Sequence, residues 1–339
     1  MCPAFFNLLK SILSLLLSPF AFPSTMNIAS RLLCVSANPA IDRRVAVPNF
    51  RSGAVNRARS VDPAAGGKAA HVAFAAKALG ADVRWLAFVG GAEGESCRQE
   101  IAARGVEPLS VKIAGRTRTN LELIDESSGE ITEVLEPGPS IREEEQAEFL
   151  RRFDEELKSH PVVVISGSLP GDVRDSFYRE LITRARNADC IAMLDTSGEA
   201  LSQSLTAAPD LIKPNRDEAG VLLGIQISSI AEAVQAARSL RQRGPRAVIL
   251  SLGSEGAVAV GDSYVLHARA PVVNAISTVG SGDSFLAGWA VGVASTLSPD
   301  ACLRLAIACG TANCLASSPG VISNDEVQRL LEQVEISRV

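Results

Sequence analysis

The decisive stretch of the chain reads Ser277-Thr278-Val279-Gly280-Ser281-Gly282-Asp283-Ser284-Phe285-Leu286-Ala287-Gly288, a glycine-rich turn that leads into an apolar helix. The backbone N–H groups of such a turn and the helix dipole together form a site for a phosphate group. A carboxylate there repels phosphate, and phosphoryl transfer explains the conflict: the amides hold the moving group while Asp283 takes a proton from the attacking hydroxyl. The alternative is an ordinary helix start, in which Asp283 only interacts with the first turn.

The composition is that of a globular protein, with 339 residues of which 47% are hydrophobic and 21% are charged. This length allows one large α/β domain or two smaller ones. The formal net charge of −5 gives no overall positive field that would attract nucleic acid. Any phosphate site must therefore be local.

The seven cysteines are scattered and include no C-x-x-C pair, which favours a reducing compartment and a cytoplasmic location. Cys302, Cys309 and Cys314 lie in an alanine-rich apolar stretch and are interpreted as small core residues. Only three histidines are present and none lies near a cysteine, so we expect no zinc site.

Residues 1–30 form an apolar extension before the first expected strand. Residues 5–22 resemble the hydrophobic region of a signal peptide or a short anchor. The run is short for a membrane span, and Pro19 and Pro23 interrupt its end. We interpret Met26 as the true translation start, which leaves no membrane segment in the mature protein. Export is the alternative.

From Arg31 onward, short apolar runs alternate with helical stretches, a pattern typical of a mostly parallel sheet covered by helices on both faces. We expect one doubly wound α/β domain over residues 31–339. The expected strands are 32–35, 83–89, 162–165, 190–194, 211–212 and 247–250. The expected helices are 68–79, 95–103, 174–186, 231–241, 284–294 and 300–315.

Two segments, about 44–61 and 109–136, break this alternation. They contain strand-like stretches in which polar and apolar residues alternate, such as Leu121-Glu122-Leu123, and a turn signal at Ser127-Ser128-Gly129. Because they are too short for a second hydrophobic core, we expect a small sheet that projects from the main domain as a lid over a ligand.

Six further motifs lie at expected strand ends or helix starts, and ligands bind at the carboxyl edge of open α/β sheets. In chain order they are Ala37-Asn38-Pro39-Ala40-Ile41-Asp42, Ala65-Gly66-Gly67-Lys68, Thr117-Arg118-Thr119-Asn120, Ser166-Gly167-Ser168-Leu169-Pro170, Lys213-Pro214-Asn215-Arg216-Asp217-Glu218 and Ser251-Leu252-Gly253-Ser254-Glu255-Gly256. Each also has a structural interpretation as a turn, a cap or a solvated residue. Asn215 and Glu218, for example, have the spacing of a helix capping box.

The residue types in these motifs suit a phosphorylated sugar and a nucleotide. Asp42 can accept hydrogen bonds from two sugar hydroxyls, Lys68 offers a mobile positive charge and Arg118 can bind a phosphate bidentately. Glu218 is predicted to hold Mg²⁺ through water, since this cation keeps most of its hydration shell. The order of the motifs and their shared positions favour one binding site.

In this order the motifs resemble those of the ribokinase-like (pfkB) sugar kinases, most closely the hexose-phosphate branch with 1-phosphofructokinase, tagatose-6-phosphate kinase and the minor 6-phosphofructokinase. The resemblance covers the chain from about Arg31 onward. It implies a ribokinase-like doubly wound fold with a small lid sheet, the use of ATP and Mg²⁺, and transfer of the γ-phosphoryl group to a sugar-phosphate hydroxyl. It also implies a homodimer joined through the lid.

The resemblance makes Asp283 the catalytic base and Gly280, Ser281 and Gly282 the anion hole. The expected substrate-binding residues are Asp42, Gly67, Lys68, His71, Arg118, Asn120 and Ser168, of which Arg118 and Ser168 match contacts to the resident phosphate. The expected Mg-ATP residues are Lys213, Asn215, Glu218, Ser251, Gly253 and Gly256.

The chain departs from the family pattern on the sugar side. The usual Gly-Gly-Lys-Gly-x-Asn is here Gly66-Gly67-Lys68-Ala69-Ala70-His71, so a histidine replaces an amide that would bond a sugar hydroxyl. If neutral His71 faces the sugar, acceptor affinity is expected to fall as pH drops through about 6.5, the ordinary pKa of histidine.

The sequence therefore predicts an ATP-dependent kinase that phosphorylates a hydroxyl of a hexose monophosphate. Fructose 1-phosphate is the leading acceptor, and tagatose 6-phosphate and fructose 6-phosphate are the alternatives. Two other classes stay open. One is a kinase-fold protein that binds a sugar phosphate without catalysis, and the other is an exported solute-binding α/β protein. The intact Asp283 motif argues against both.

Overall fold

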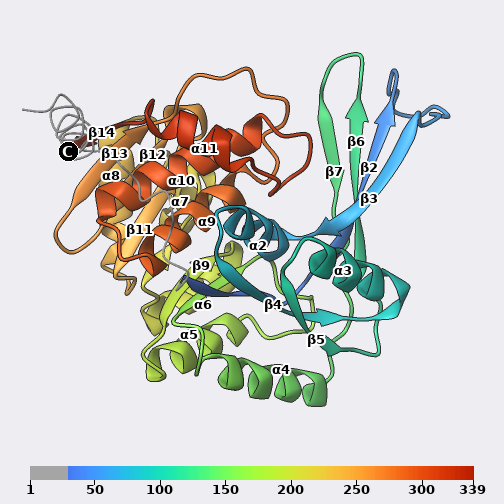
Figure 1. Ribbon diagram of the computed structural model, residues 1–339, viewed down its shortest axis with the longest axis horizontal. Coiled ribbons are helices and arrows are strands. Elements are labelled where there is room, and N and C mark those ends of the chain that lie inside the picture. The colour runs from blue at the N-terminus through green and yellow to red at the C-terminus, as the bar shows by residue number, and fades with distance from the viewer. Residues whose placement is uncertain (1–29) are drawn as a thin grey trace, which may run out of the picture.

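The computed structural model describes residues 30–339, and a ten-stranded sheet forms the centre of the molecule (Figure 1). Its parallel strands are β1 (Arg31–Ser36), β4 (Asp82–Val89), β5 (Glu107–Lys112), β8 (Val162–Ser166), β9 (Ile191–Asp195), β10 (Leu211–Ile212) and β11 (Ala247–Ser251). The antiparallel strands are β12 (Ala257–Val260), β13 (Val265–Arg269) and β14 (Glu335–Arg338). The strand order is β14-β13-β12-β11-β10-β9-β8-β1-β4-β5.

Helices cover both faces of this sheet, as the apolar strands require. One face packs against α2 (Lys68–Ala78), α3 (Gly91–Ala103), α9 (Ser281–Ala294), α10 (Pro299–Cys314) and α11 (Asn324–Leu331). The other face packs against α4 (Glu143–Glu156), α5 (Phe177–Asn187), α6 (Gly198–Ser204), α7 (Arg216–Leu223) and α8 (Ile230–Arg241). Side chains alternate along β1, so Leu32 and Leu33 enter opposite cores.

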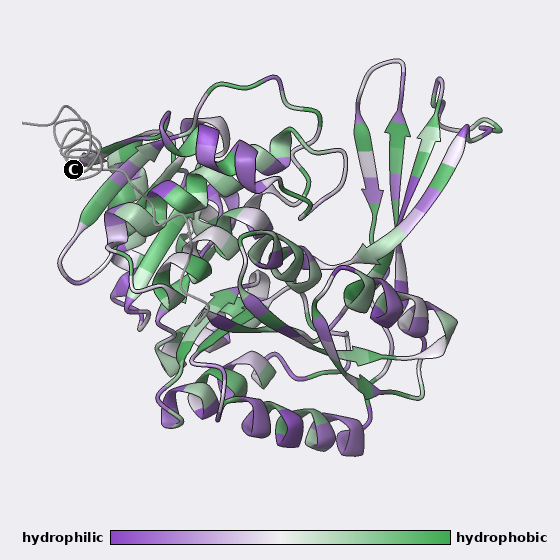
Figure 2. Cartoon of the chain, in the orientation of Figure 1, coloured by the Kyte–Doolittle hydropathy of each residue, from purple (hydrophilic) through white to green (hydrophobic). Residues whose placement is uncertain are grey.

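Hydropathy follows this layering. In Figure 2, α4 is largely hydrophilic, because it presents one face to solvent. Its buried Phe149 packs on Phe88 of β4, with ring centroids 4.3 Å apart. Across the described residues, none of the helices combines the length and the hydrophobicity needed to cross a bilayer.

The doubly wound, mostly parallel arrangement that the sequence predicts is confirmed, and each expected strand and helix is present within a few residues. The antiparallel edge and helices α6 and α11 were not among the expected elements, whereas α7 begins beside Asn215 as the capping-box spacing predicts. Helix α9 begins at Ser281 rather than at the expected residue 284, because Gly280 forms its N-cap with a left-handed φ of 77°.

A second, four-stranded sheet projects from the main body (Figure 1). We call it the projecting sheet; it consists of β3 (Ser60–Gly66), β2 (Ala40–Val47), β6 (Arg118–Asp125) and β7 (Ile131–Val134), in that order. Its boundaries differ from the predicted 44–61 and 109–136. Residues 109–112 belong to β5 of the main sheet, because Leu109 and Val111 pair with β4. The predicted extension over residues 1–30 lies outside the described residues except for Ser30.

Candidate active site

The strand ends, the helix starts and the projecting sheet together line a pocket of about 1150 Å³. Every residue that the sequence predicts to bind substrate or to react lies along it. The predicted sugar-phosphate residues are Asp42, Gly67, Lys68, His71, Arg118, Asn120 and Ser168. The predicted nucleotide residues are Lys213, Asn215, Glu218, Ser251, Gly253 and Gly256, and the predicted catalytic turn is 280–283.

The glycine-rich turn forms the first turn of α9. First-turn amides have no hydrogen-bond partner within the helix, so those of Gly282 and Asp283 can bind an anion. A Cβ atom placed on Gly282 would lie 3.3 Å from Nζ of Lys213, so the buried ammonium of Lys213 stands beside these amides. Two sources of positive potential therefore meet at one end of the turn.

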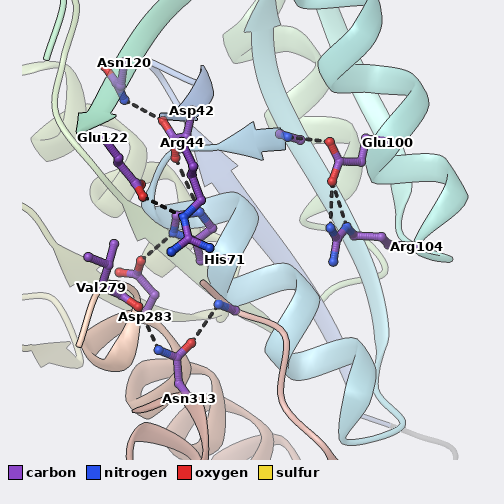
Figure 3. Close-up of polar contacts among 12 residues, drawn as sticks. Asp42, Arg44, His71, Glu100, Arg104, Asn120, Glu122, Val279, Asp283 and Asn313 are labelled. Atoms are coloured by element: carbon purple, nitrogen blue, oxygen red, sulfur yellow. Dashed lines mark hydrogen bonds and ion pairs between the residues drawn. The ribbon is translucent and has the colours of Figure 1, made fainter. Parts of the chain in front are cut away.

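Asn313 of α10 fixes the shape of this turn. Its Nδ2 donates to the carbonyl oxygen of Val279 at 2.7 Å (Figure 3). Its Oδ1 accepts from the amide of Gly320 at 2.8 Å and from Oγ of Ser284 at 3.0 Å. Asn313 is 1% exposed, so these bonds form away from water. The sequence analysis missed this residue, because it lies inside an apolar helix.

Asp283 is buried and points toward His71 of α2. Nδ1 of His71 lies 3.0 Å from Oδ2 of Asp283, and Nε2 lies 3.6 Å from Oδ2 of Asp42 (Figure 3). Burial would lower the pKa of His71, but the bond to Asp283 and the nearby carboxylates outweigh burial and raise it. This direction opposes the expectation of a neutral histidine that faces only the sugar.

The strands of the projecting sheet supply a polar wall. Side chains alternate along a strand, so Asn120 and Glu122 lie on the same face of β6, and both are buried. Asn120 donates to Oδ1 of Asp42 at 2.7 Å, and Arg44 of β2 contacts Glu122 at 3.1 Å. Burial, together with the charge of Asp42, raises the pKa of Glu122. The alternation that predicted a projecting strand therefore also marks the wall of the pocket.

Arg118 and Ser168 lie where loops converge on the pocket. Nη1 of Arg118 donates to the carbonyl of Glu136 at 2.8 Å, whereas its buried Nε has no hydrogen-bond partner among the described residues. Nδ2 of Asn38 lies 3.2 Å from Oγ of Ser168 and also donates to the carbonyl of Pro137 at 3.0 Å. Asn38 thus ties the segment after β1 to two other loops.

Asp195, at the end of β9, is a site residue that the sequence analysis missed. It is 1% exposed and lies between two lysines, with Oδ1 3.3 Å from Nζ of Lys68 and Oδ2 3.2 Å from Nζ of Lys213. Burial disfavours its charge, but the lysines outweigh burial and hold its pKa below the usual range. Asp195 therefore links the predicted sugar side to the predicted nucleotide side.

The predicted nucleotide side is built from two neighbouring strand ends. Asn215 and Glu218 form the capping box that was the structural alternative: Asn215 Oδ1 accepts from the Glu218 amide at 2.8 Å, and Glu218 Oε2 accepts from the Asn215 amide at 2.9 Å. A β-bridge joins Asn215 to Ser251, which precedes the short helix η2 (Gly253–Glu255). Capping uses one oxygen of Glu218, so the residue can cap and still face the pocket.

The part of the chain that the structure describes has no cluster of side chains that could bind a metal ion directly. No group of three or more His, Cys, Asp or Glu side chains within residues 30–339 could hold a metal ion. Mg²⁺ bound mainly by water and phosphate oxygens needs no such group. The single carboxylate of Glu218 fits Mg²⁺ that is held mainly by water and phosphate oxygens, and it does not fit direct ligation by several side chains.

Comparison with known proteins places these features in a family. The sequence profile of the pfkB family carbohydrate kinases matches residues 30–326. This chain belongs to that family. It is 31% identical to the 1-phosphofructokinase of Bacillus subtilis over 305 residues, which covers 90% of this chain and 99% of the relative. It is 32% identical to a tagatose-6-phosphate kinase of Staphylococcus epidermidis, with 91% of this chain and 100% of the relative covered.

A solved member of the family shares the fold. Phosphofructokinase-2 from Escherichia coli, crystallised with fructose-6-phosphate, aligns with a TM-score of 0.84 and 28% sequence identity. The alignment covers 90% of this chain and 99% of that structure. The chain is therefore a pfkB phosphotransferase that acts on a hydroxyl group, as the glycine-rich turn predicts.

Proposed function

We propose that this pfkB kinase transfers the γ-phosphoryl group of ATP to a hydroxyl of a hexose monophosphate. Fructose 1-phosphate is the leading acceptor, with fructose 1,6-bisphosphate as product; tagatose 6-phosphate and fructose 6-phosphate are the alternatives. The single observation that carries the proposal is that a helix-start anion hole, a buried carboxylate and a partly unpaired arginine line one pocket. The names of the similar kinases support the same class of acceptor.

In the proposed chemical step, Asp283 is the base. His71 contacts Oδ2 of Asp283, which leaves Oδ1 for the acceptor hydroxyl. As a new bond forms between the oxygen of the acceptor hydroxyl and the γ-phosphorus, the hydroxyl proton passes to Oδ1 of Asp283. The bond between the γ-phosphorus and the bridging oxygen breaks, and that oxygen leaves with ADP. The amides of the α9 start and the ammonium of Lys213 neutralise the charge on the transferring group.

ATP and Mg²⁺ are part of this proposal. The glycines and small side chains around Ser251 and η2 leave the backbone open to a nucleotide, and Glu218 lies within the same pocket. Mg²⁺ would supply charge neutralisation at the phosphates and would be held by Glu218 through water.

A kinase assay on the purified full chain tests the function. ATP consumption should be fast with one of the three hexose phosphates and slow with fructose or ribose, which lack the phosphate that Arg118 would bind. Consumption with the unphosphorylated sugars alone would overturn the hexose-phosphate assignment. Tight sugar-phosphate binding without ATP consumption would favour the non-catalytic alternative.

Replacement of Arg118 by alanine should raise KM for the sugar phosphate far more than KM for ATP. Only the acceptor carries a resident phosphate that needs this fork-shaped cation, and a charged hydrogen bond contributes about 1.5–3 kcal/mol, which corresponds to about 10- to 150-fold. Steady-state kinetics with each substrate varied measure the effect. Arg116→Ala is a matched control, because Arg116 is exposed and pairs with Glu93. Equal effects of the two changes would show that Arg118 is an ordinary surface residue.

We further propose that the protein is cytoplasmic and forms a homodimer through the projecting sheet, which acts as a lid. Val61 and Val134 of this sheet are 42% and 54% exposed, and exposed apolar strands favour association. The described cysteines are all free, which suits a reducing compartment. Sedimentation velocity with Val134→Lys beside the wild type checks the interface: a dimer that the change leaves intact would place the contact elsewhere.

A further inference from the structure

Charged side chains from three elements converge on the imidazole of His71. Asp283 comes from α9 and Asp42 from β2, and Glu122 of β6 is close enough to affect the ring electrostatically (Figure 3). The cations nearby are Arg44, which pairs with Glu122, Lys68, one turn earlier on α2, which pairs with Asp195, and Arg118 of β6, which interacts electrostatically with Asp42. His71, Asp42, Asp283 and Glu122 are all buried, with exposures of 2–7%.

Both ring nitrogens of His71 face carboxylate oxygens. Nδ1 lies 3.0 Å from Oδ2 of Asp283, and Nε2 lies 3.6 Å from Oδ2 of Asp42. A neutral imidazole has one N–H donor and one lone pair, so it would turn the lone pair toward one of these anions. An imidazolium has two N–H groups, so it can donate a hydrogen bond to Asp283 and form an ion pair with Asp42. The geometry therefore selects the charged ring.

The charged ring also solves an electrostatic problem in the pocket. Asp42 and Asp283 would otherwise repel each other, and both would repel an incoming phosphate. Asn120 is uncharged, and Arg44 pairs with Glu122. Lys68 interacts with Asp283 and Arg118 with Asp42 only at longer range, because Lys68 pairs with Asp195 and Arg118 donates to Glu136. His71 is the group that lies between these two carboxylates and contacts both.

We propose that His71 is a positioning residue of this kinase, an imidazolium that bridges Asp42 and Asp283 and fixes Asp283 with its other oxygen toward the acceptor hydroxyl. The inference rests on the proposed function, because it takes Asp283 as the base. It gives the chain a pH-dependent element in its active site. The charge of the bridge is present at low pH and is lost as pH rises through the pKa of His71, which lies above 6.5. Affinity for anionic substrates should therefore fall as pH rises, opposite to the direction that a neutral His71 predicts.

Histidine NMR on the full chain tests the bridge without any need for turnover. The chain has only three histidines, so ¹⁵N and ¹³C signals of the rings can be assigned by single substitutions. His71 should titrate above 6.5, and both Asp283→Asn and Asp42→Asn should lower its pKa. His160 and His267 serve as internal references, because they lie away from the pocket lining. A His71 pKa at or below 6.5, or one that Asp283→Asn leaves unchanged, would overturn the proposal.

Kinetics of His71→Asn and His71→Gln supply the second test. Each variant should lower kcat by up to about 10²-fold, the effect of a displaced catalytic group. The wild-type loss of activity with rising pH should disappear in both variants, whereas a merely structural histidine would leave the shape of the pH profile unchanged. Such an unchanged profile would contradict the bridge. If the wild type consumes no ATP with any sugar phosphate, the proposed function fails, and the NMR titration still decides the state of His71.

Discussion

The substitution Asp283→Asn is expected to lower kcat by about 10²–10⁴-fold and to leave Mg-ATP binding nearly intact. Asparagine keeps the size and polarity of aspartate but cannot take the proton of the acceptor hydroxyl. The amides at the start of α9 and the ammonium of Lys213, which would hold the phosphates, are unchanged by this substitution. Chemistry and nucleotide binding should therefore separate.

Steady-state kinetics and equilibrium titration with ATP measure the two quantities. Asp325→Asn is a matched control, because Asp325 also lies in the first turn of a helix, α11, but is exposed. If Asp283 served only as a helix-start acid, both changes would have similar small effects on stability and none on kcat. A variant at position 283 that kept more than about a tenth of the wild-type kcat would support that interpretation.

A simple rule predicts from sequence that some of the site residues line the pocket. Polar residues that directly follow buried parallel strands meet at one edge of the sheet, and Ser168 and Lys213 have this position. The expectation that Asp42 also ends such a strand was wrong, because Asp42 lies inside β2 of the projecting sheet. The same rule applies to Asp195, which ends β9. It was missed because a lone aspartate after a strand is also an ordinary turn residue, and its two lysine partners are visible only in three dimensions.

Pairing partners explain the errors in the boundary of the projecting sheet. Residues 107–112 and 118–125 both have the short alternating pattern of a strand, yet the first pairs with β4 and the second with β2. Period-two alternation shows that a segment is a strand and that one face is polar. It does not show which neighbouring strand supplies the hydrogen bonds.

The direction of the pKa shift of His71 is the clearest case of information that local sequence lacks. Its partner Asp283 is 212 residues away, and the pKa of the ring depends on that contact. A sequence-based expectation has to begin from the ordinary pKa of histidine. Here, burial lowers the pKa of the ring and three carboxylates raise it, and the effect of the carboxylates is larger.

The substitution Asp195→Asn is expected to lower the free energy of unfolding by about 3 kcal/mol at neutral pH. The oxygen of the asparagine amide can accept a hydrogen bond from one of the two lysines. Its NH₂ group would then face the other lysine, and no hydrogen bond can form because both groups are donors. Lys213 has a side chain only 5% exposed, so its charge would stay in the protein without a balancing carboxylate. Lys68 is 41% exposed and can turn to water, which keeps the loss at the lower end of the range for buried pairs.

Urea unfolding of the wild type and the variant measures this difference, and Asp262→Asn is the matched control. Asp262 pairs with Arg241, and its side chain is 75% exposed, so its change should matter by less than about 1 kcal/mol. The pH dependence gives a second criterion. The folded-state pKa of Asp195 is depressed, so its contribution is present above its ordinary pKa of 3.8 and is lost as pH falls through the lower folded value. The variant and the wild type should therefore differ at pH 7 and converge in strong acid. A difference as small as that of Asp262→Asn would show that water screens the two lysines from Asp195.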